Sequence, residues 1–431
     1  EMCIRDRCNG IECIKLRYMM KLLIKNKRLK EEIPYELFAL FINTVMIIDL
    51  LRIIVGNVNA LEIVRNGIYV FTAMYVIYHA IGHKHLSVLM AFGMGYAFLA
   101  AFSLLRNDGI TEVVLSGSMI FLTRCLAAFY LAYYLPINEC FFKKMKKYYV
   151  ILFLYCFVYI TTHTSGIYAT DGSYMTFSYN ILIMTLVCLL NCVEKPTPLR
   201  TLGVVVLLGI IVAYGARGPL ICIVISLLLF LWYKFASFSV WKKIILFCFC
   251  IGGGSGLFMV RNTIIDILLR FNPSSRTLYL LKNFKIDNLS GRNTYYDLLR
   301  TEINKNWFLP HGIYSDRLIL SGGGMSSNVD LSQYYAHNLP IEVMYQFGGF
   351  IGVLVLIFLI VKIIKSYIIV IKQNNHKLAI VYCAFFSGIT TLFFSSSYLI
   401  NERAWLVFGI VFSAGKFVNQ KSIVQKCRLR Q

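Results

Sequence analysis

Apolar stretches of about 20 residues, separated by short charged or turn-forming segments, run along most of the chain. A helix needs about 20 apolar residues to cross a bilayer. Such runs lie at 36–56, 67–82, 86–105, 113–135, 148–166, 177–193, 200–215, 218–236, 241–260, 341–364, 378–399 and 404–420. The pattern predicts an all-α polytopic integral membrane protein with about twelve transmembrane helices.

One connection is much longer than the others and covers residues 261–340, between the ninth and tenth predicted helices. Loops of this length are usually functional or disordered. Within it, Tyr295, Leu299 and Ile303 recur every four residues, which predicts an amphipathic helix. An earlier run, 262–271, predicts a second one. We therefore expect a partly helical loop rather than a disordered one.

Composition and charge agree with a membrane protein. Of the 431 residues, 58% are hydrophobic and 15% are charged, and the mean hydropathy is +0.67. The formal net charge is +22, but about fourteen lysines and arginines fall in alternate loops, on the side of the basic N-terminus. Only Arg65, Arg106, Arg217 and Arg403 fall in the short loops of the other side. The positive-inside rule then places both termini in the cytoplasm, so the charge reflects topology and no nucleic-acid partner is expected.

The expected organisation follows from the runs and the charges. It comprises a cytoplasmic basic N-terminus (1–35), transmembrane helices 1–9 (36–260), an extracytoplasmic loop (261–340), transmembrane helices 10–12 (341–420) and a cytoplasmic basic tail (421–431). Residues 1–18 resemble translated upstream sequence, and we expect the true start near Met19 or Met20. N-terminal sequencing that began at Glu1 would refute this.

Neither a disulfide framework nor a metal site is predicted. The chain has 13 cysteines, and those from Cys125 to Cys383 fall in apolar runs, where cysteine behaves as a small hydrophobe. Cys3, Cys8 and Cys13 have neither zinc-site nor redox spacing. No HxxxH or HExxH pattern lies on the predicted outer side.

Arg217 is the first candidate for a functional residue. It lies in the tight turn Tyr214-Gly-Ala-Arg-Gly-Pro219 between two predicted helices. The free N–H groups of the next helix, expected to start at Pro219, favour an anion, and a guanidinium binds phosphate through a bidentate fork. The alternative is an arginine that reaches to lipid headgroups.

Arg292 is the second candidate, in Leu289-Ser-Gly-Arg-Asn-Thr-Tyr-Tyr296. Ser290 has the character of an N-cap, so Arg292 would open the amphipathic helix of the long loop. An arginine at a helix N-terminus is again an anion-binding arrangement. A solvated surface arginine is the alternative.

His337 and Asn338 directly precede Pro340, which predicts the start of the tenth helix. A neutral imidazole is the usual general base near neutral pH. The alternative for His337 is an interfacial histidine whose ring is satisfied by its neighbours.

Arg124 lies near the middle of the fourth predicted span, a costly position for a charge. It would either form a structural ion pair or contact an anionic substrate. Asp49 and Arg52, three residues apart in the first predicted helix, are expected to pair.

Three of these motifs occur in a characteristic order: an Ala-Arg-Gly turn between mid-chain helices, a Ser-Gly-Arg that opens the loop helix, and a His-Asn before the next membrane helix. In this order, and on one predicted side of the membrane, they resemble the O-antigen ligase and O-antigen polymerase superfamily, also called the Wzy type. The motifs cover roughly residues 200–352, and the helix count and long outer loop extend the resemblance to the whole chain. Ala216 stands where the family usually has serine, and Tyr295 and Tyr296 stand where a tryptophan is usual.

The resemblance implies a metal-independent, inverting membrane glycosyltransferase that uses no cofactor. Its donor would be a glycan on undecaprenyl diphosphate, and it would act at the outer face of the bacterial inner (plasma) membrane. Carried over by motif, Arg217 and Arg292 would hold the diphosphate and His337 would deprotonate the acceptor hydroxyl. Arg124 and Asn338 are secondary candidates. Membrane lipid, a chain-length regulator and a flippase are the further partners that the resemblance implies.

Three functions stay open at this stage. The leading one is polymerisation of the repeat units of a surface polysaccharide, such as O-antigen, capsule or exopolysaccharide. A ligase that transfers the lipid-linked glycan to lipid A core or another acceptor shares the fold and the residues. A polysaccharide flippase or transporter would place its site near the bilayer midplane, often on broken helices. Arg124 and the glycine cluster at 252–256 are the features that favour this third function.

Overall fold

A computed structural model of the chain describes residues 10–56, 58–164, 173–236, 241, 259–270, 278–279, 282, 292–322 and 334–414, with only the backbone described for 10–31. All regular secondary structure within these ranges is helical. Seven of the described helices are long and apolar enough to cross a membrane, by length and composition, and α8 is a shorter apolar helix. The described part of the chain therefore has the architecture of a helical membrane protein.

The helices follow one another with short connections in the first half of the chain. They are α1 (Gly10–Val55), α2 (Asn59–Gly82), α3 (Leu86–Arg106), α4 (Thr111–Ile120), a π-helical turn (Phe121–Cys125), α5 (Leu126–Tyr134), α6 (Glu139–Thr164), α7 (Ser173–Glu194), α8 (Pro198–Tyr214) and α9 (Arg217–Ala236). The second half contains α12 (Arg292–Lys305), α13 (Ser315–Leu320), α14 (Leu339–Phe347), α15 (Gly349–Gln373) and α16 (His376–Thr391). Residues 259–270 and 402–414 are helical as well.

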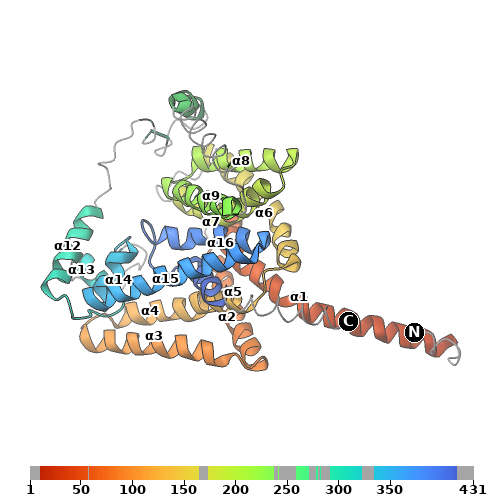
Figure 1. The fold of residues 1–431 in the computed structure, drawn as a ribbon, viewed down its shortest axis with the longest axis horizontal. Coiled ribbons are helices and arrows are strands. Elements are labelled where there is room, and N and C mark those ends of the chain that lie inside the picture. The colour runs from red at the N-terminus through yellow and green to blue at the C-terminus, as the bar shows by residue number, and fades with distance from the viewer. Residues whose placement is uncertain are drawn as a thin grey trace.

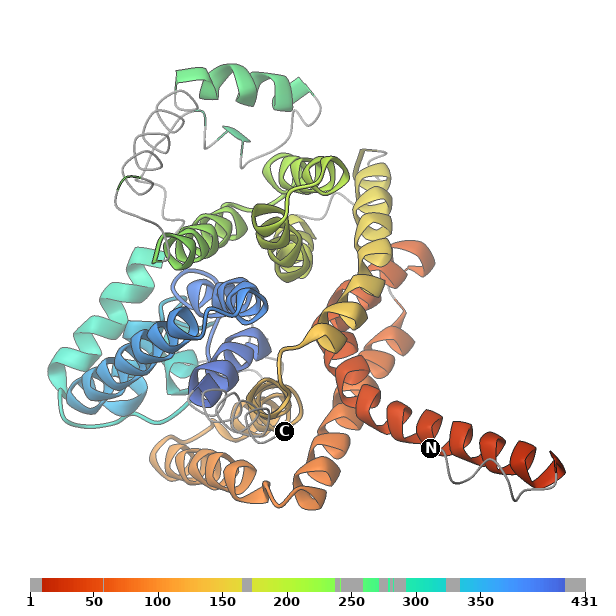
Figure 2. The same cartoon turned by 45° about the vertical axis from the view of Figure 1, so that its right-hand side comes forward.

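The helices pack into a bundle, with α12, α13 and α14 gathered at one end (Figure 1). α1 packs against α6 and α2, and α16 packs against α9 and α7. One apolar core joins these helices to residues 402–414. The N-terminal half of α1 projects away from the bundle in both views (Figures 1 and 2).

Many large apolar side chains face outward instead of into this core. On α15, Leu354, Ile357 and Phe358 are each at least half exposed. Such a face is unusual for a soluble protein, whereas the hydrocarbon of a bilayer covers it without cost.

The amphipathic helix predicted in the long loop is confirmed as α12. Leu299 and Ile303 are buried, at 0% and 3% exposure, and form a small core with Tyr345 of α14. Tyr295 packs against the same core. The second predicted loop helix, 262–271, corresponds to the helical residues 259–270.

The single helix predicted at 341–364 is wrong, because the chain breaks at Gly348 into α14 and α15. Gly348 has a φ of +80°, and a Cβ there would lie 3.1 Å from the carbonyl carbon of Leu309. Only glycine combines this backbone conformation with so close an approach. α15 then continues to Gln373, beyond the predicted end. An apolar run carries no signal for such a break.

The last two predicted spans differ in a similar way. Instead of one helix over 378–399, α16 ends at Thr391 and the chain turns through 392–401 before the helix at 402–414. Most of the span at 241–260, the glycine cluster at 252–256 and residues 415–420 lie outside the described residues. The count of twelve helices stays a prediction.

Candidate functional site

His337 lies at the end of the molecule where α12 and α14 meet. Asn338 caps α14 by accepting a hydrogen bond from the backbone N–H of Ile341, and Pro340 lies in the first turn, as the sequence predicts. His337 itself has a φ of +50°, a left-handed conformation that is uncommon for residues other than glycine. Such conformations are held by their surroundings and are frequent at functional sites.

Neighbouring side chains surround the imidazole of His337, but they do not use all of its hydrogen-bonding capacity. Its ring packs on Tyr335, with 3.9 Å between ring centroids. The hydroxyl of Tyr296 on α12 donates to the carbonyl of His337 at 3.4 Å. Nδ1 is buried and has no hydrogen-bond partner among the described residues.

Two arginines act on the same imidazole. Burial, followed by the charges of Arg292 and Arg317, lowers the pKa of His337 to about 4. The ring is therefore neutral at physiological pH, which is the form that can accept a proton. The structure thus brings together two of the predicted residues, Arg292 and His337.

Arg292 is the first residue of α12, as the sequence predicts. Its Nη1 donates a short hydrogen bond to the carbonyl of Phe394, in the turn that follows α16. The side chain is half-buried. This bond fixes the guanidinium between the start of α12 and the 392–401 turn.

Arg217 is the first residue of α9, two residues earlier than the expected start at Pro219. Its side chain is exposed. The adjacent Gly218 is tightly packed, because a Cβ there would lie 2.0 Å from the hydroxyl of Tyr179 and 2.9 Å from the ring of Phe394. Phe394 therefore contacts both arginine-bearing helix starts, through its ring at Gly218 and its carbonyl at Arg292.

The 392–401 turn connects these groups to one another. Ser395 donates from its hydroxyl to that of Tyr179 on α7 at 2.7 Å. Its carbonyl accepts from the hydroxyl of Tyr335 at 2.6 Å. The turn thus joins α7 to the residue that stacks on His337.

A buried charged cluster, which the sequence analysis missed, lies next to this turn. It comprises Asp316, Arg317, Glu342, Gln346 and Ser397, all at most 2% exposed. Arg317 donates to Asp316 Oδ1 at 2.9 Å and to Ser397 Oγ at 3.0 Å. Gln346 donates from Nε2 to Asp316 Oδ1 at 2.9 Å, and Ser397 donates to Glu342.

The segment that carries Asp316 and Arg317 is fixed to α3. Ser103 donates to the carbonyl of Ile313 at 2.6 Å, and Asn107 donates to the carbonyl of His311 at 2.8 Å. Arg317 also lies over the ring of Tyr314, 4.8 Å from its centroid. Arg317, one of the two arginines that lower the pKa of His337, is therefore held in place by its surroundings.

Two observations distinguish the charged cluster from an ordinary, fully hydrogen-bonded part of the interior. Asp316 Oδ2 and Arg317 Nε are buried without a hydrogen-bond partner among the described residues, and unsatisfied polar atoms are costly in an interior. Burial, followed by the Asp316 charge, raises the pKa of Glu342, which favours its protonated form.

Arg124, a secondary candidate, lies in the π-helical turn between α4 and α5. Its Nη2 donates to Asn66 Oδ1 at 2.9 Å, and its guanidinium lies over the ring of Tyr69, 4.7 Å from the centroid. These partners belong to α2, so the described contacts do not join Arg124 to His337. The pair predicted in the first helix is confirmed, since Arg52 Nη1 lies 3.7 Å from Asp49 Oδ1.

Comparison of the chain with protein-family models, with curated proteins and with solved structures found no match.

Proposed function

We propose that this protein is a membrane glycosyltransferase that polymerises the repeat units of a surface polysaccharide carried on undecaprenyl diphosphate. The observation that carries the proposal is the pairing of His337 and Arg292. A neutral imidazole, one of whose ring nitrogens has no partner among the described residues, lies within electrostatic range of a guanidinium at a helix start. A base next to an anion site is what transfer of a glycan from a diphosphate to a hydroxyl requires.

The donor's diphosphate would bind at Arg292, with Arg217 as its second ligand. Both begin helices, α12 and α9, whose first N–H groups favour negative charge. Phe394 links the two helix starts, because its carbonyl accepts a hydrogen bond from Arg292 and its ring packs at Gly218, the neighbour of Arg217. Bidentate hydrogen bonds from guanidinium groups stabilise the charge that develops on the leaving diphosphate.

His337 would act as the base. Its pKa of about 4 is low for this task in the empty site, because two arginine charges oppose protonation. A bound diphosphate offsets those charges and raises the basicity of the imidazole when the donor is present. The proton of the acceptor hydroxyl passes to His337 as its oxygen bonds to the anomeric carbon. The bond from that carbon to the phosphate oxygen breaks, the diphosphate leaves, and the configuration inverts.

The direct test is product analysis in proteoliposomes with undecaprenyl-diphosphate-linked repeat units. Polymerisation predicts a ladder of lipid-linked oligomers. A second sample contains lipid A core, and transfer to that acceptor without a ladder would identify a ligase instead. Donor that crosses the bilayer without any new glycosidic bond would overturn the enzymatic proposal in favour of a transporter.

A further inference from the structure

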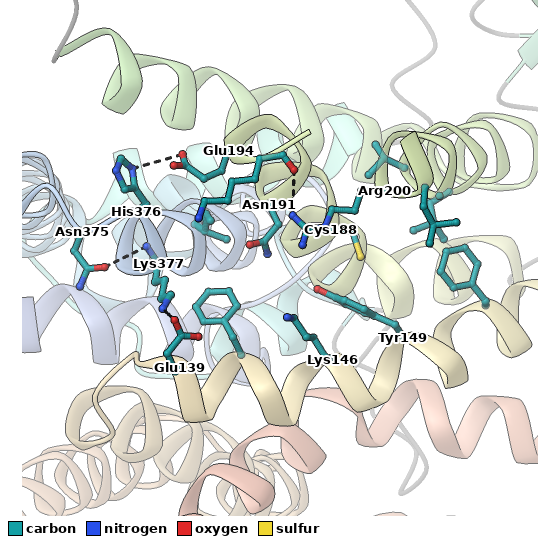
Figure 3. Close-up of a pocket in the computed structure, with 18 of the residues that line it drawn as sticks. Glu139, Lys146, Tyr149, Cys188, Asn191, Glu194, Arg200, Asn375, His376 and Lys377 are labelled. Atoms are coloured by element: carbon teal, nitrogen blue, oxygen red, sulfur yellow. Dashed lines mark hydrogen bonds and ion pairs between the residues drawn. The ribbon is translucent and has the colours of Figure 1, made fainter. Parts of the chain in front are cut away.

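A cavity of about 730 Å³ lies at the other end of the bundle, between α6, α7, α8 and the start of α16 (Figure 3). Pockets for small ligands are usually of this size. Phe394 and Arg292 meet beyond the last residue of α16, whereas His376, its first residue, lines the cavity. The 16 residues of α16 separate the two places by about 24 Å, at 1.5 Å per residue. The cavity is therefore distinct from the site around His337.

The cavity has an apolar wall. Phe153 of α6 and Leu199 of α8 lie at its outer side and are 41% and 80% exposed, while Val204 and Leu207 of α8 lie deeper and are buried. Gly203 lines it between them, and a Cβ there would meet only Phe153, at 3.4 Å. This wall would suit an acyl chain.

The lining of the cavity has a surplus of positive charge. Four of its lining residues are Lys or Arg and two are Glu. Both glutamates are already paired, Glu139 with Lys377 and Glu194 with Lys234 and His376. Lys146, Lys195 and Arg200 remain, and none of the ion pairs between described residues holds them.

The cations that lie outside the described ion pairs line the same cavity. Lys146 extends from α6 and Arg200 from α8, on opposite walls (Figure 3). The guanidinium of Arg200 is oriented by a 3.1 Å hydrogen bond to the carbonyl of Lys195. Asn191 of α7 uses Nδ2 to bond the carbonyl of Val187.

From this arrangement we propose that the cavity binds an anionic phospholipid, with its phosphate between Lys146 and Arg200 and an acyl chain along the wall at Gly203. Basic pockets between membrane helices at the cytoplasmic side are suited to such headgroups. A second cavity, of about 450 Å³ between α2, α3 and residues 122–127, has an entirely apolar lining and offers a headgroup no partner. The basic residues of the larger cavity are the reason for assigning it an anionic lipid.

The test is lipid binding to the purified full chain, measured by native mass spectrometry during titration with phosphatidylglycerol or phosphatidylcholine. The double variant Lys146→Ala/Arg200→Ala is expected to bind phosphatidylglycerol about 30-fold more weakly, since each of the two basic residues near a lipid surface contributes about 1 kcal/mol. Its binding of phosphatidylcholine should not change. Lys143→Ala, an exposed lysine on α6 that does not line the cavity, is the matched control and should bind as the wild type does.

A second variant, Gly203→Leu, keeps every charge and fills the apolar wall. It should weaken binding of phosphatidylglycerol several-fold. Equal affinity of the double variant and the wild type would overturn the proposal, as would an equal loss in Lys143→Ala. Displacement of the lipid by millimolar inorganic phosphate would identify a phosphate site instead of a lipid site, and unchanged affinity in Gly203→Leu would remove the acyl chain from the cavity.

Discussion

His337 combines a left-handed backbone, a half-buried side chain and the electrostatic influence of two arginines. The variant Arg292→Gln removes one of the charges that oppose its protonation, so the pKa of His337 should rise from about 4 toward its ordinary value. Titration of labelled histidine by NMR, with His337→Gln to assign the signal, measures this pKa. Arg300→Gln on the exposed side of α12 is the control and should leave it unchanged. If the pKa of His337 were the same in Arg292→Gln and Arg300→Gln, the proximity of Arg292 and His337 would be contradicted.

The lowered pKa of His337 also gives stability a pH dependence. Between pH 4 and 6.5 the unfolded chain binds more protons at this residue than the folded chain does. The contribution of His337 to the free energy of unfolding is therefore fully present above pH 6.5 and is lost as the pH falls toward 4. Thermal unfolding in detergent should show a smaller drop from pH 7 to pH 5 in His337→Gln than in the wild type. An equal drop would contradict the lowered pKa.

Asp316 and Arg317 form a fully buried ion pair. Arg317→Met alone leaves the Asp316 carboxylate buried without its partner and should lower the free energy of unfolding by about 3–5 kcal/mol. The double variant Asp316→Asn/Arg317→Met removes both charges and should recover most of that loss. Denaturation of the double variant and of both single variants, Arg317→Met and Asp316→Asn, measures the coupling. Purely additive losses would mean that the two charges do not interact.

At the scale of helices, α9 is positioned by the close approach of Gly218 to Tyr179 and Phe394. A methyl group at residue 218 has no space, so Gly218→Ala should displace Phe394 and with it the partner of Arg292. Overpacking of this kind lowers the free energy of unfolding by about 1–3 kcal/mol. Glycan transfer should fall as well, in the proteoliposome assay. Gly209→Ala on α8, where a Cβ has no neighbour within 4 Å, is the control and should be neutral.

Sequence patterns correctly predict the elements that depend only on residues close together in the chain. The four-residue spacing of Tyr295, Leu299 and Ile303 predicts the buried face of α12, and Asn338 with Pro340 predicts the start of α14. Local patterns also place Arg292 at the first position of α12.

What the sequence could not predict depends on contacts between distant segments. Asp316 and Arg317 are neighbours in a loop, and nothing nearby indicates that Ser397 and Glu342 surround them. The one local signal was Glu342 and Gln346, four residues apart within an apolar run, where a helix turns them to the same side. The break at Gly348 likewise depends on its approach to Leu309.

At the scale of the whole molecule, the site around His337 and the cavity lined by Lys146 and Arg200 lie at opposite ends of α16. The distribution of basic residues predicts that the cavity faces the cytoplasm and α12 the outer side. A membrane-impermeant maleimide should then label Arg300→Cys on intact cells and Lys143→Cys only after permeabilisation. Labelling of the unchanged chain sets the background. The reverse pattern would contradict the topology.

The central claim is that Arg217 and Arg292 hold one lipid-linked diphosphate while His337 deprotonates the acceptor hydroxyl. The most direct measurement is the rate at which proteoliposomes consume undecaprenyl-diphosphate-linked repeat units, for the alanine variant of each residue and for Arg300→Ala. Loss of a general base costs about 10²–10⁴-fold in rate, so His337→Ala should fall by at least about 100-fold. The two arginine variants should lose activity as well, while Arg300→Ala keeps the wild-type rate. Wild-type rates in all three variants would contradict the account.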